Sequence, residues 1–191
     1  MSQTTPAHPM TLTRERTILV VLDVQERLFH AMDADHREEV MRNIKVLAAA
    51  ARRLTVPTVV TEQYPKGLGH TLEELKDALG PGVEPIEKVT FSCGVEPFRA
   101  RLTATGAQHV VLTGIEAHVC VLMSALDLLA AGYSVHVVAD AVTSRSQGNW
   151  RLAMDQLRQA GAVVTATETV LFQLLRQADT EDFRELARLI R

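Results

Sequence analysis

The sequence predicts one three-layer α/β domain built on a doubly wound, six-stranded parallel sheet with the strand order 3-2-1-4-5-6. Short, continuously apolar, β-branched runs recur along the chain, which is typical of strands buried on both faces of a parallel sheet. Segments with helical spacing separate these runs, and this alternation favours right-handed β-α-β crossovers. The length of 191 residues and the apolar content of 47% suit a single core.

The expected strands and helices alternate along the chain. Five β-branched runs cover residues 17–22, 57–61, 109–113, 134–138 and 162–165, and a weaker run at residues 85–89 falls where a sixth strand would complete the sheet. Helical spacing covers residues 37–54, 71–79, 97–105, 118–131 and 149–160. Gly106, Gly132 and Gly161 each follow a helical stretch and precede a strand, as glycines that end helices do. Residues 169–191 are expected to form one or two closing amphipathic helices, with an apolar face for the body or for a second subunit.

Composition narrows the class of protein. Residues 1–16 are polar and are expected to form a flexible N-terminal segment, so the domain is assigned to residues 17–191. They lack the apolar core of a signal peptide, and no run reaches the ~18 apolar residues that span a bilayer, so we expect a cytoplasmic protein without membrane contact. The net charge of -3 and the scattered arginines argue against a nucleic-acid partner. Two cysteines, Cys93 and Cys120, are too few for a disulfide framework.

Two residues mark the expected ligand site. In this strand order the first and fourth strands are neighbours, and open α/β sheets bind ligands outside the carboxyl ends of such strands. Asp23 follows the first strand, and Cys120 lies near the first turn of the helix after the fourth. Free N–H groups and the helix dipole would favour a thiolate there. Alone, Asp23 could equally be a cap or a loop acid, and for Cys120 alone a packed core residue is the favoured interpretation.

A lysine completes the set. Lys88 leaves the third strand at the same edge of the sheet, where it would keep Asp23 ionised and favour a neighbouring thiolate. An ordinary surface lysine is the commoner fate of this residue type. The order Asp, Lys, Cys after strands one, three and four resembles the isochorismatase-like cysteine hydrolases. The resemblance covers about residues 17–175 and is carried most clearly by residues 61–69, 114–121 and 137–145.

The resemblance implies roles for particular residues. Cys120 would attack a carbonyl carbon, Asp23 would carry the proton, and Lys88 would steady the charges. The backbone N–H groups of Glu116 and Cys120 would form an oxyanion hole, with a cis peptide between Ile115 and Glu116. The substrate pocket would include Gln25, Phe91 and Ile115. The expected substrate is a small amide, ureide or related carbonyl compound, bound as a thioester at Cys120.

Departures from the family exclude other chemistry. Nicotinamidases of this superfamily carry an Asp-x-His motif and a further His that hold a metal, whereas residues 62–65 read Glu-Gln-Tyr-Pro here, so no metal is expected. No Gly-x-Gly-x-x-Gly follows the first strand, which argues against a dinucleotide, and no cofactor is expected. True isochorismatases replace the cysteine, so hydrolysis of a vinyl ether is not expected.

Three alternatives and one assembly stay open. The cleft could belong to a catalytically silent binding or regulatory module. Cys120 and Cys93 could form a thiol redox sensor if their Cα atoms lie within about 4.4–6.8 Å. His118, two residues before the cysteine, could act as a base, although this spacing points it to a different face of a helix. The resemblance also implies a homo-oligomer, a dimer or a tetramer.

Overall fold

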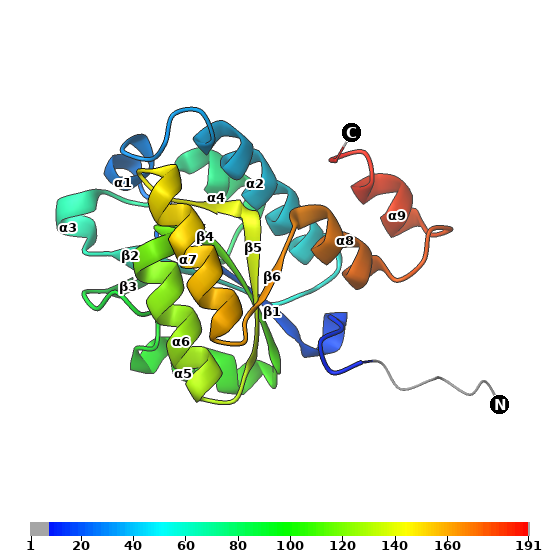
Figure 1. Cartoon of the computed structure of the whole chain (residues 1–191). Helices are drawn as coiled ribbons and strands as arrows, with labels where there is room; N and C mark the ends of the chain where they lie inside the picture. Colours follow the sequence, from blue (N-terminus) through cyan, green and yellow to red (C-terminus); the bar gives the residue numbers. More distant parts are fainter. Residues whose placement is uncertain (1–7, 191) are drawn as a thin grey trace.

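The parallel sheet has the predicted topology. The computed structural model describes residues 8–190 and contains six strands in the order β3-β2-β1-β4-β5-β6, each pair parallel (Figure 1). The strands are β1 (Thr17–Leu22), β2 (Thr58–Gln63), β3 (Ile86–Lys88), β4 (His109–Ile115), β5 (Ser134–Thr143) and β6 (Val163–Thr165). Strands β1 and β4 are central neighbours, which confirms the predicted switch point.

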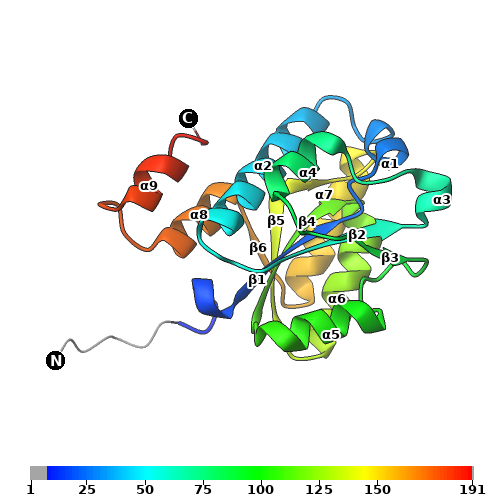
Figure 2. The same ribbon diagram turned by 180° about the vertical axis from the view of Figure 1, so that it is seen from behind.

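Helices cover both faces of the sheet, as Figures 1 and 2 show. One face packs against α2 (Arg37–Arg53), α4 (Glu73–Leu79) and α8 (Thr167–Leu175). The other packs against α5 (Glu96–Thr105), α6 (Leu122–Ala130) and α7 (Gln147–Gln159). Alternate residues of β1 enter the two cores, with Leu19 and Val21 on the first face and Ile18 and Val20 on the second. A strand buried on both sides must be continuously apolar, which explains the run seen in the sequence.

Some elements differ from the sequence expectation. β5 continues to Thr143, five residues beyond the expected end at residue 138. Helices α1 (Glu26–His30) and α3 (Pro65–Leu68) were not expected, because each is too short to show helical periodicity. The helix expected at residues 118–131 is divided into a π-helical turn, Ala117–Val121, and α6.

Residues just before β1 pack against the C-terminal helices. Of the segment expected to be flexible, residues 1–7 lie outside the described part of the chain. In the rest, Leu12 is buried and donates its N–H to Gln173 in α8, and a 3-10 turn spans Arg14–Arg16. The Arg14 side chain donates to the carbonyl of Leu174 and to Asp182 in α9 (Glu181–Leu186).

The apolar face of the closing helices belongs to the body. Leu171, Leu175 and Leu186 are buried in the core that α2 shares with the sheet. Among the large apolar side chains of residues 169–190, those of Phe172 and Leu189 are exposed. The sequence left open whether this apolar face packs against the body of the domain or against a second subunit. Most of it packs against the body. Within residues 8–190, no helix is both long and apolar enough to cross a membrane.

Candidate active site

The site begins where β1 and β4 end side by side. Leu22 is paired with Gly114, and Asp23 follows directly with a φ of 56°. A Cβ on Gly114 would lie 2.1 Å from the carbonyl oxygen of Leu22, and the φ of Gly114 is 107°. Glycine is therefore required at this close approach. It lets the two strands bring Asp23 and the turn after β4 together.

Asp23 and Lys88 form a buried ion pair. The ammonium Nζ of Lys88 lies 2.7 Å from Oδ2 of Asp23, and both side chains are 0% exposed. The hydroxyl of Thr61 donates to the other oxygen, Oδ1, at 2.6 Å. The two charges come from β3 and from the end of β1, with β2 between them. The predicted pairing of the aspartate with the lysine is thus present.

The ammonium of Lys88 is surrounded by oxygen atoms. Besides Asp23, it donates to Oε1 of Gln63 at 3.0 Å and to the carbonyl oxygens of Thr90 and Phe91 at 3.3 and 3.2 Å. An ammonium group has three N–H donors and no acceptor, so the four oxygens share its three donors. A charge buried without such partners would be costly.

Cys120 lies in the π-helical turn next to this pair. It is 6% exposed, and burial raises the pKa of its thiol to about 12, helped by the negative charge of Asp23 and a hydrogen bond to it. Lys88 and the backbone N–H of Glu116 act in the opposite direction but do not outweigh burial. The expectation of a thiolate is therefore wrong for the ligand-free protein. The resting group is a thiol beside a carboxylate.

The turn that carries Cys120 is held by side chains of the segment that follows β5 and of α7. The peptide between Ile115 and Glu116 is cis, which confirms that expectation. The carboxylate of Glu116 accepts from Arg145 Nη2 at 2.6 Å and Nε at 3.0 Å. Burial raises the pKa of Glu116, but Arg145 outweighs it and the net pKa is lowered. His118 bonds to Ser144 and Asn149 rather than to Asp23, so its ring contributes to the same scaffold.

The three residues expected to line the pocket occupy different environments. Gln25 is fully buried; its amide donates to the carbonyls of Gln63 and Gly69 and accepts from the N–H of Gln63. Ile115 is fully buried in the core. Phe91 is exposed in the turn after β3. Of the three, only Phe91 has an exposed side chain, and its backbone carbonyl accepts from Lys88.

Sequence reasoning missed Thr61 and Gln63 as members of this site. They are alternate residues of β2, so their side chains share one face of the strand, and both contact the ion pair. A signal was present, because two polar residues follow the apolar run of β2 at period two on the site edge of the sheet. Residues 62–65 were considered only because they lack the metal ligands of the nicotinamidases.

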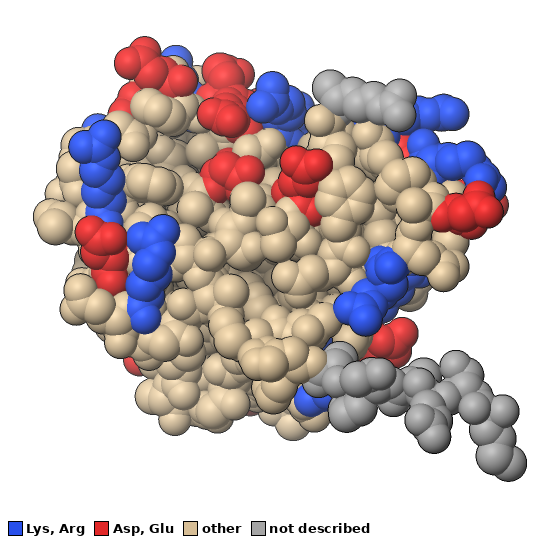
Figure 3. Space-filling model, turned by 45° about the vertical axis from the view of Figure 1, so that its right-hand side comes forward, with Lys and Arg blue, Asp and Glu red and all other residues tan. Residues whose placement is uncertain are grey.

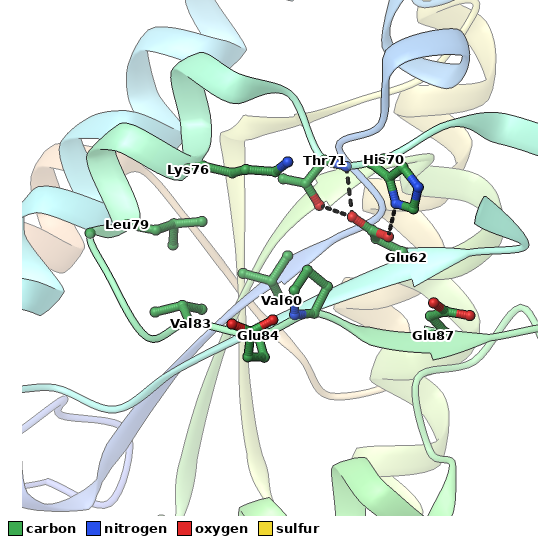
Figure 4. A pocket seen from close by; sticks show the side chains of 11 residues that line it. Val60, Glu62, His70, Thr71, Lys76, Leu79, Val83, Glu84 and Glu87 are labelled. Carbon is green, nitrogen blue, oxygen red and sulfur yellow. Dashed lines mark hydrogen bonds and ion pairs between the residues drawn. The ribbon is translucent and has the colours of Figure 1, made fainter. Parts of the chain in front are cut away.

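A separate hollow of about 440 Å³ lies between α4 and the β2–β3 edge (Figure 4). Glu62 points into it from the opposite face of β2, and its carboxylate accepts from the N–H and hydroxyl of Thr71 and contacts His70. Burial raises the pKa of Glu62, but these hydrogen bonds outweigh it and the net pKa is lowered. Asp23, Lys88 and Cys120 do not line this hollow. Glu62 therefore anchors the loop before α4.

The other cysteine is in the core. Cys93 is 0% exposed, and burial raises the pKa of its thiol to about 11. Its backbone N–H donates to the hydroxyl of Ser124 in α6. A thiol in this environment is poorly suited to redox exchange, which requires access and thiolate character. Among residues 8–190, no three His, Cys, Asp or Glu side chains are grouped so that they could hold a metal ion.

The chain was compared with known proteins. The model of the isochorismatase domain matches residues 17–169. The chain is 39% identical over 180 residues to isochorismatase domain-containing protein 2 of Danio rerio, covering 94% of this chain and 89% of that protein. It is 40% identical over 179 residues to the secreted isochorismatase effector Isc1 of Phytophthora sojae, covering 92% and 84%.

Solved structures agree with the fold. The MAR1 ribonuclease of Caenorhabditis elegans superposes with a TM-score of 0.88 at 40% identity, covering 94% of this chain and 92% of that one. YcaC of Escherichia coli, described as an octameric hydrolase of unknown specificity, gives 0.87 at 25% identity, covering 97% and 91%. YcaC of Pseudomonas aeruginosa, solved with covalent acrylamide, gives 0.85 at 25% identity, covering 97% and 98%.

Proposed function

Because the chain belongs to the isochorismatase family, we propose that it is a cysteine hydrolase that acts on a small amide, ureide or related carbonyl compound. The observation that carries the proposal is the buried Asp23–Lys88 pair beside the thiol of Cys120. A carboxylate held by a cation next to a nucleophile is the arrangement that covalent catalysis requires. YcaC of Pseudomonas aeruginosa, which holds acrylamide covalently, gives a related precedent for an amide bound in this fold.

The proposed reaction has two halves. Asp23 takes the thiol proton as Cys120 Sγ attacks the carbonyl carbon, and the N–H groups of Glu116 and Cys120 bind the oxyanion that forms. Asp23 returns the proton to the leaving amine, the C–N bond breaks, and a thioester remains. Water then attacks the thioester, again giving a proton to Asp23, which passes it back to the sulfur as the acid leaves. No step needs a metal or another cofactor.

The raised pKa of Cys120 is consistent with this order of events. A permanent thiolate would be open to alkylation and oxidation at all times, whereas a thiol with a pKa of about 12 ionises only as its proton moves to Asp23 during attack on an electrophilic carbon. Lys88 remains positively charged throughout, so it stabilises the carboxylate before proton transfer and the thiolate during it. We include Phe91 in the substrate pocket because its side chain is exposed and its backbone carbonyl accepts a hydrogen bond from Lys88.

The experiment that tests the proposal is mass spectrometry of the protein after incubation with a mixture of amides and ureides. A thioester adduct on the peptide containing Cys120 is expected, and Cys120→Ser should abolish it. Cys93→Ser should leave it unchanged. Rapid alkylation of Cys120 without an adduct from any carbonyl compound would favour a catalytically silent binding or regulatory module instead. A disulfide between the two cysteines in oxidised protein would favour a redox sensor.

A second candidate comes from the name of one relative. The Caenorhabditis elegans protein that is 40% identical is called a ribonuclease. The charge of this chain argues against a polyanionic substrate, since the net charge is -3 and acidic and basic side chains are interspersed on the face in Figure 3. Incubation of wild type and Cys120→Ser with RNA tests it, and cleavage that requires Cys120 would favour the ribonuclease.

We also propose a homo-oligomer. YcaC of Escherichia coli is octameric, and Figure 3 shows a broad surface free of Lys, Arg, Asp and Glu on one face of this chain. The expected dimer or tetramer stays a prediction, which light scattering would check. The cytoplasmic location also stays a prediction, because one relative of similar identity is named a secreted effector.

A further inference from the structure

We propose that Thr61 and Gln63 are positioning residues, which hold the two members of the Asp23–Lys88 pair from strand β2. This inference rests on the proposed function, because it concerns how the base is presented to Cys120. Thr61 donates its hydroxyl to Asp23, and Gln63 accepts from Lys88. One strand therefore contacts both charges of the pair.

The contacts fix the carboxylate of Asp23. Oδ1 accepts from Thr61 at 2.6 Å and Oδ2 accepts from Lys88 at 2.7 Å, while the Asp23 backbone N–H donates to the Thr61 carbonyl at 3.1 Å. With a donor on each oxygen, rotation of the carboxylate would break at least one charge-assisted hydrogen bond. The oxygen that receives the thiol proton is thereby kept in one place.

Gln63 fixes the ammonium in the same way. Its Oε1 accepts from Lys88 at 3.0 Å, and its Nε2 donates to the carbonyl of Val89 at 3.0 Å. A flipped amide would place its NH₂ group against the ammonium, so the neighbours determine the amide orientation. The backbone of Gln63 is held in turn by Gln25, which donates to its carbonyl and accepts from its N–H. Gln25 is thus a second buried side chain that supports Gln63, which in turn contacts Lys88.

The alternation of β2 provides a matched control. Glu62, between the two positioning residues, is also buried and hydrogen-bonded, but it points into the hollow of Figure 4 on the opposite face of the sheet. Glu62→Gln should weaken the anchor of the neighbouring loop without touching the ion pair. Its effect on the folded state therefore estimates what a purely structural substitution in this strand does.

The test uses iodoacetamide, which reports on Cys120 without knowledge of the substrate. The sulfur forms a bond to the CH₂ group, iodide leaves, and the thiol proton passes to Asp23. Gln63→Met and Thr61→Val should each slow alkylation of Cys120 by about 10-fold, since each removes a hydrogen bond to a charged group. Gln63→Glu retains the acceptor for Lys88 but loses the donor to the Val89 carbonyl, so its rate should lie between those of Gln63→Met and wild type.

Whether alkylation of Cys120 becomes slower or faster distinguishes a positioning role from a merely structural one. Cys120 is nearly buried, so a substitution that merely loosens the fold would expose the thiol and speed alkylation. Slower alkylation in Gln63→Met, with Glu62→Gln at or above the wild-type rate, is the expected result. Alkylation of Gln63→Met at or above the rate of Glu62→Gln would overturn the inference. The proposed function fails by a different measurement, the absence of any thioester on wild-type Cys120.

Discussion

The buried ion pair leads to a prediction about Asp23→Asn that combines stability and chemistry. Asparagine keeps the size of the side chain but removes the negative charge, leaving the ammonium of Lys88 in a site where both side chains are 0% exposed. Breaking a buried pair by removing one partner costs about 3–5 kcal/mol. Domains of ordinary size are stable by about 5–15 kcal/mol. The variant should therefore fold at 25 °C but unfold at a clearly lower urea concentration.

The chemical effect is separated by a second variant. Asp23→Asn should lower the rate of thioester formation by about 10²–10⁴, the usual contribution of a general base. In Asp23→Asn/Lys88→Met neither charge remains, and replacing a whole buried pair by uncharged groups is often neutral for stability. The double variant should regain most of the lost stability but none of the lost rate. Urea unfolding followed by circular dichroism and mass spectrometry of the Cys120 adduct measure the two quantities.

Two outcomes would refute this reasoning. If Asp23→Asn forms the thioester at more than about half of the wild-type rate, a threshold well above the expected loss, Asp23 is not the base. If the double variant regains both stability and rate, the slow reaction of the single variant reflects a damaged fold rather than a missing proton acceptor. Lys88→Met alone supplies the control for the unpaired carboxylate.

Further predictions concern accessibility, packing, pH and metals. Iodoacetamide should label Cys120 before Cys93, because Cys120 is 6% exposed and Cys93 is 0%; equal rates would count against the assignment. Gly114→Ala should unfold the protein, whereas Gly161→Ala, also at positive φ but with open space around it, should cost only the backbone strain of about 1–2 kcal/mol; equal melting temperatures would contradict this. Burial lowers the pKa of His136 to about 4, so stability is complete above about pH 6.5 and falls by about 2 kcal/mol on going to pH 5; urea unfolding of His136→Gln should lack this difference. Turnover should survive exhaustive EDTA treatment, and recovery with zinc after a loss would refute metal independence.

The sequence was sufficient for the topology because burial on both faces leaves a local trace. Strands such as β1 and β4 are continuously apolar, and the helices between them show one apolar stripe. The end of β5 was misplaced because Ala139 and Asp140 interrupt its apolar run, although the strand continues through them. Beyond this irregularity, Val142 and Thr143 pair with Gly114 and Ile115 of β4 and so keep the strand in the sheet, and such tertiary support is not visible in a local pattern.

The protonation of Cys120 could not be predicted from its position in the chain. A helix start and a nearby lysine both favour a thiolate, and Lys88 does lower the pKa of the thiol in the folded chain. Burial and the charge of Asp23 act in the opposite direction and prevail. The degree of burial depends on how the turn after β4 packs against the rest of the folded chain. That closure is a property of the folded chain, and spacing alone does not report it.

The resting charges of the site suggest why a lysine is paired with the base instead of with the nucleophile. Lys88 and Asp23 together carry no net charge, so the thiol faces a neutral pair, and moving its proton to Asp23 turns that pair into a cation beside a thiolate. The positive charge thus becomes available to the sulfur only while the proton is on Asp23. In a site of low dielectric this contrast is strong. In the mechanism that we propose, Asp23 and Lys88 therefore keep Cys120 unreactive at rest and activate it when an electrophilic carbon is within reach, provided that the pair is held in place from β2.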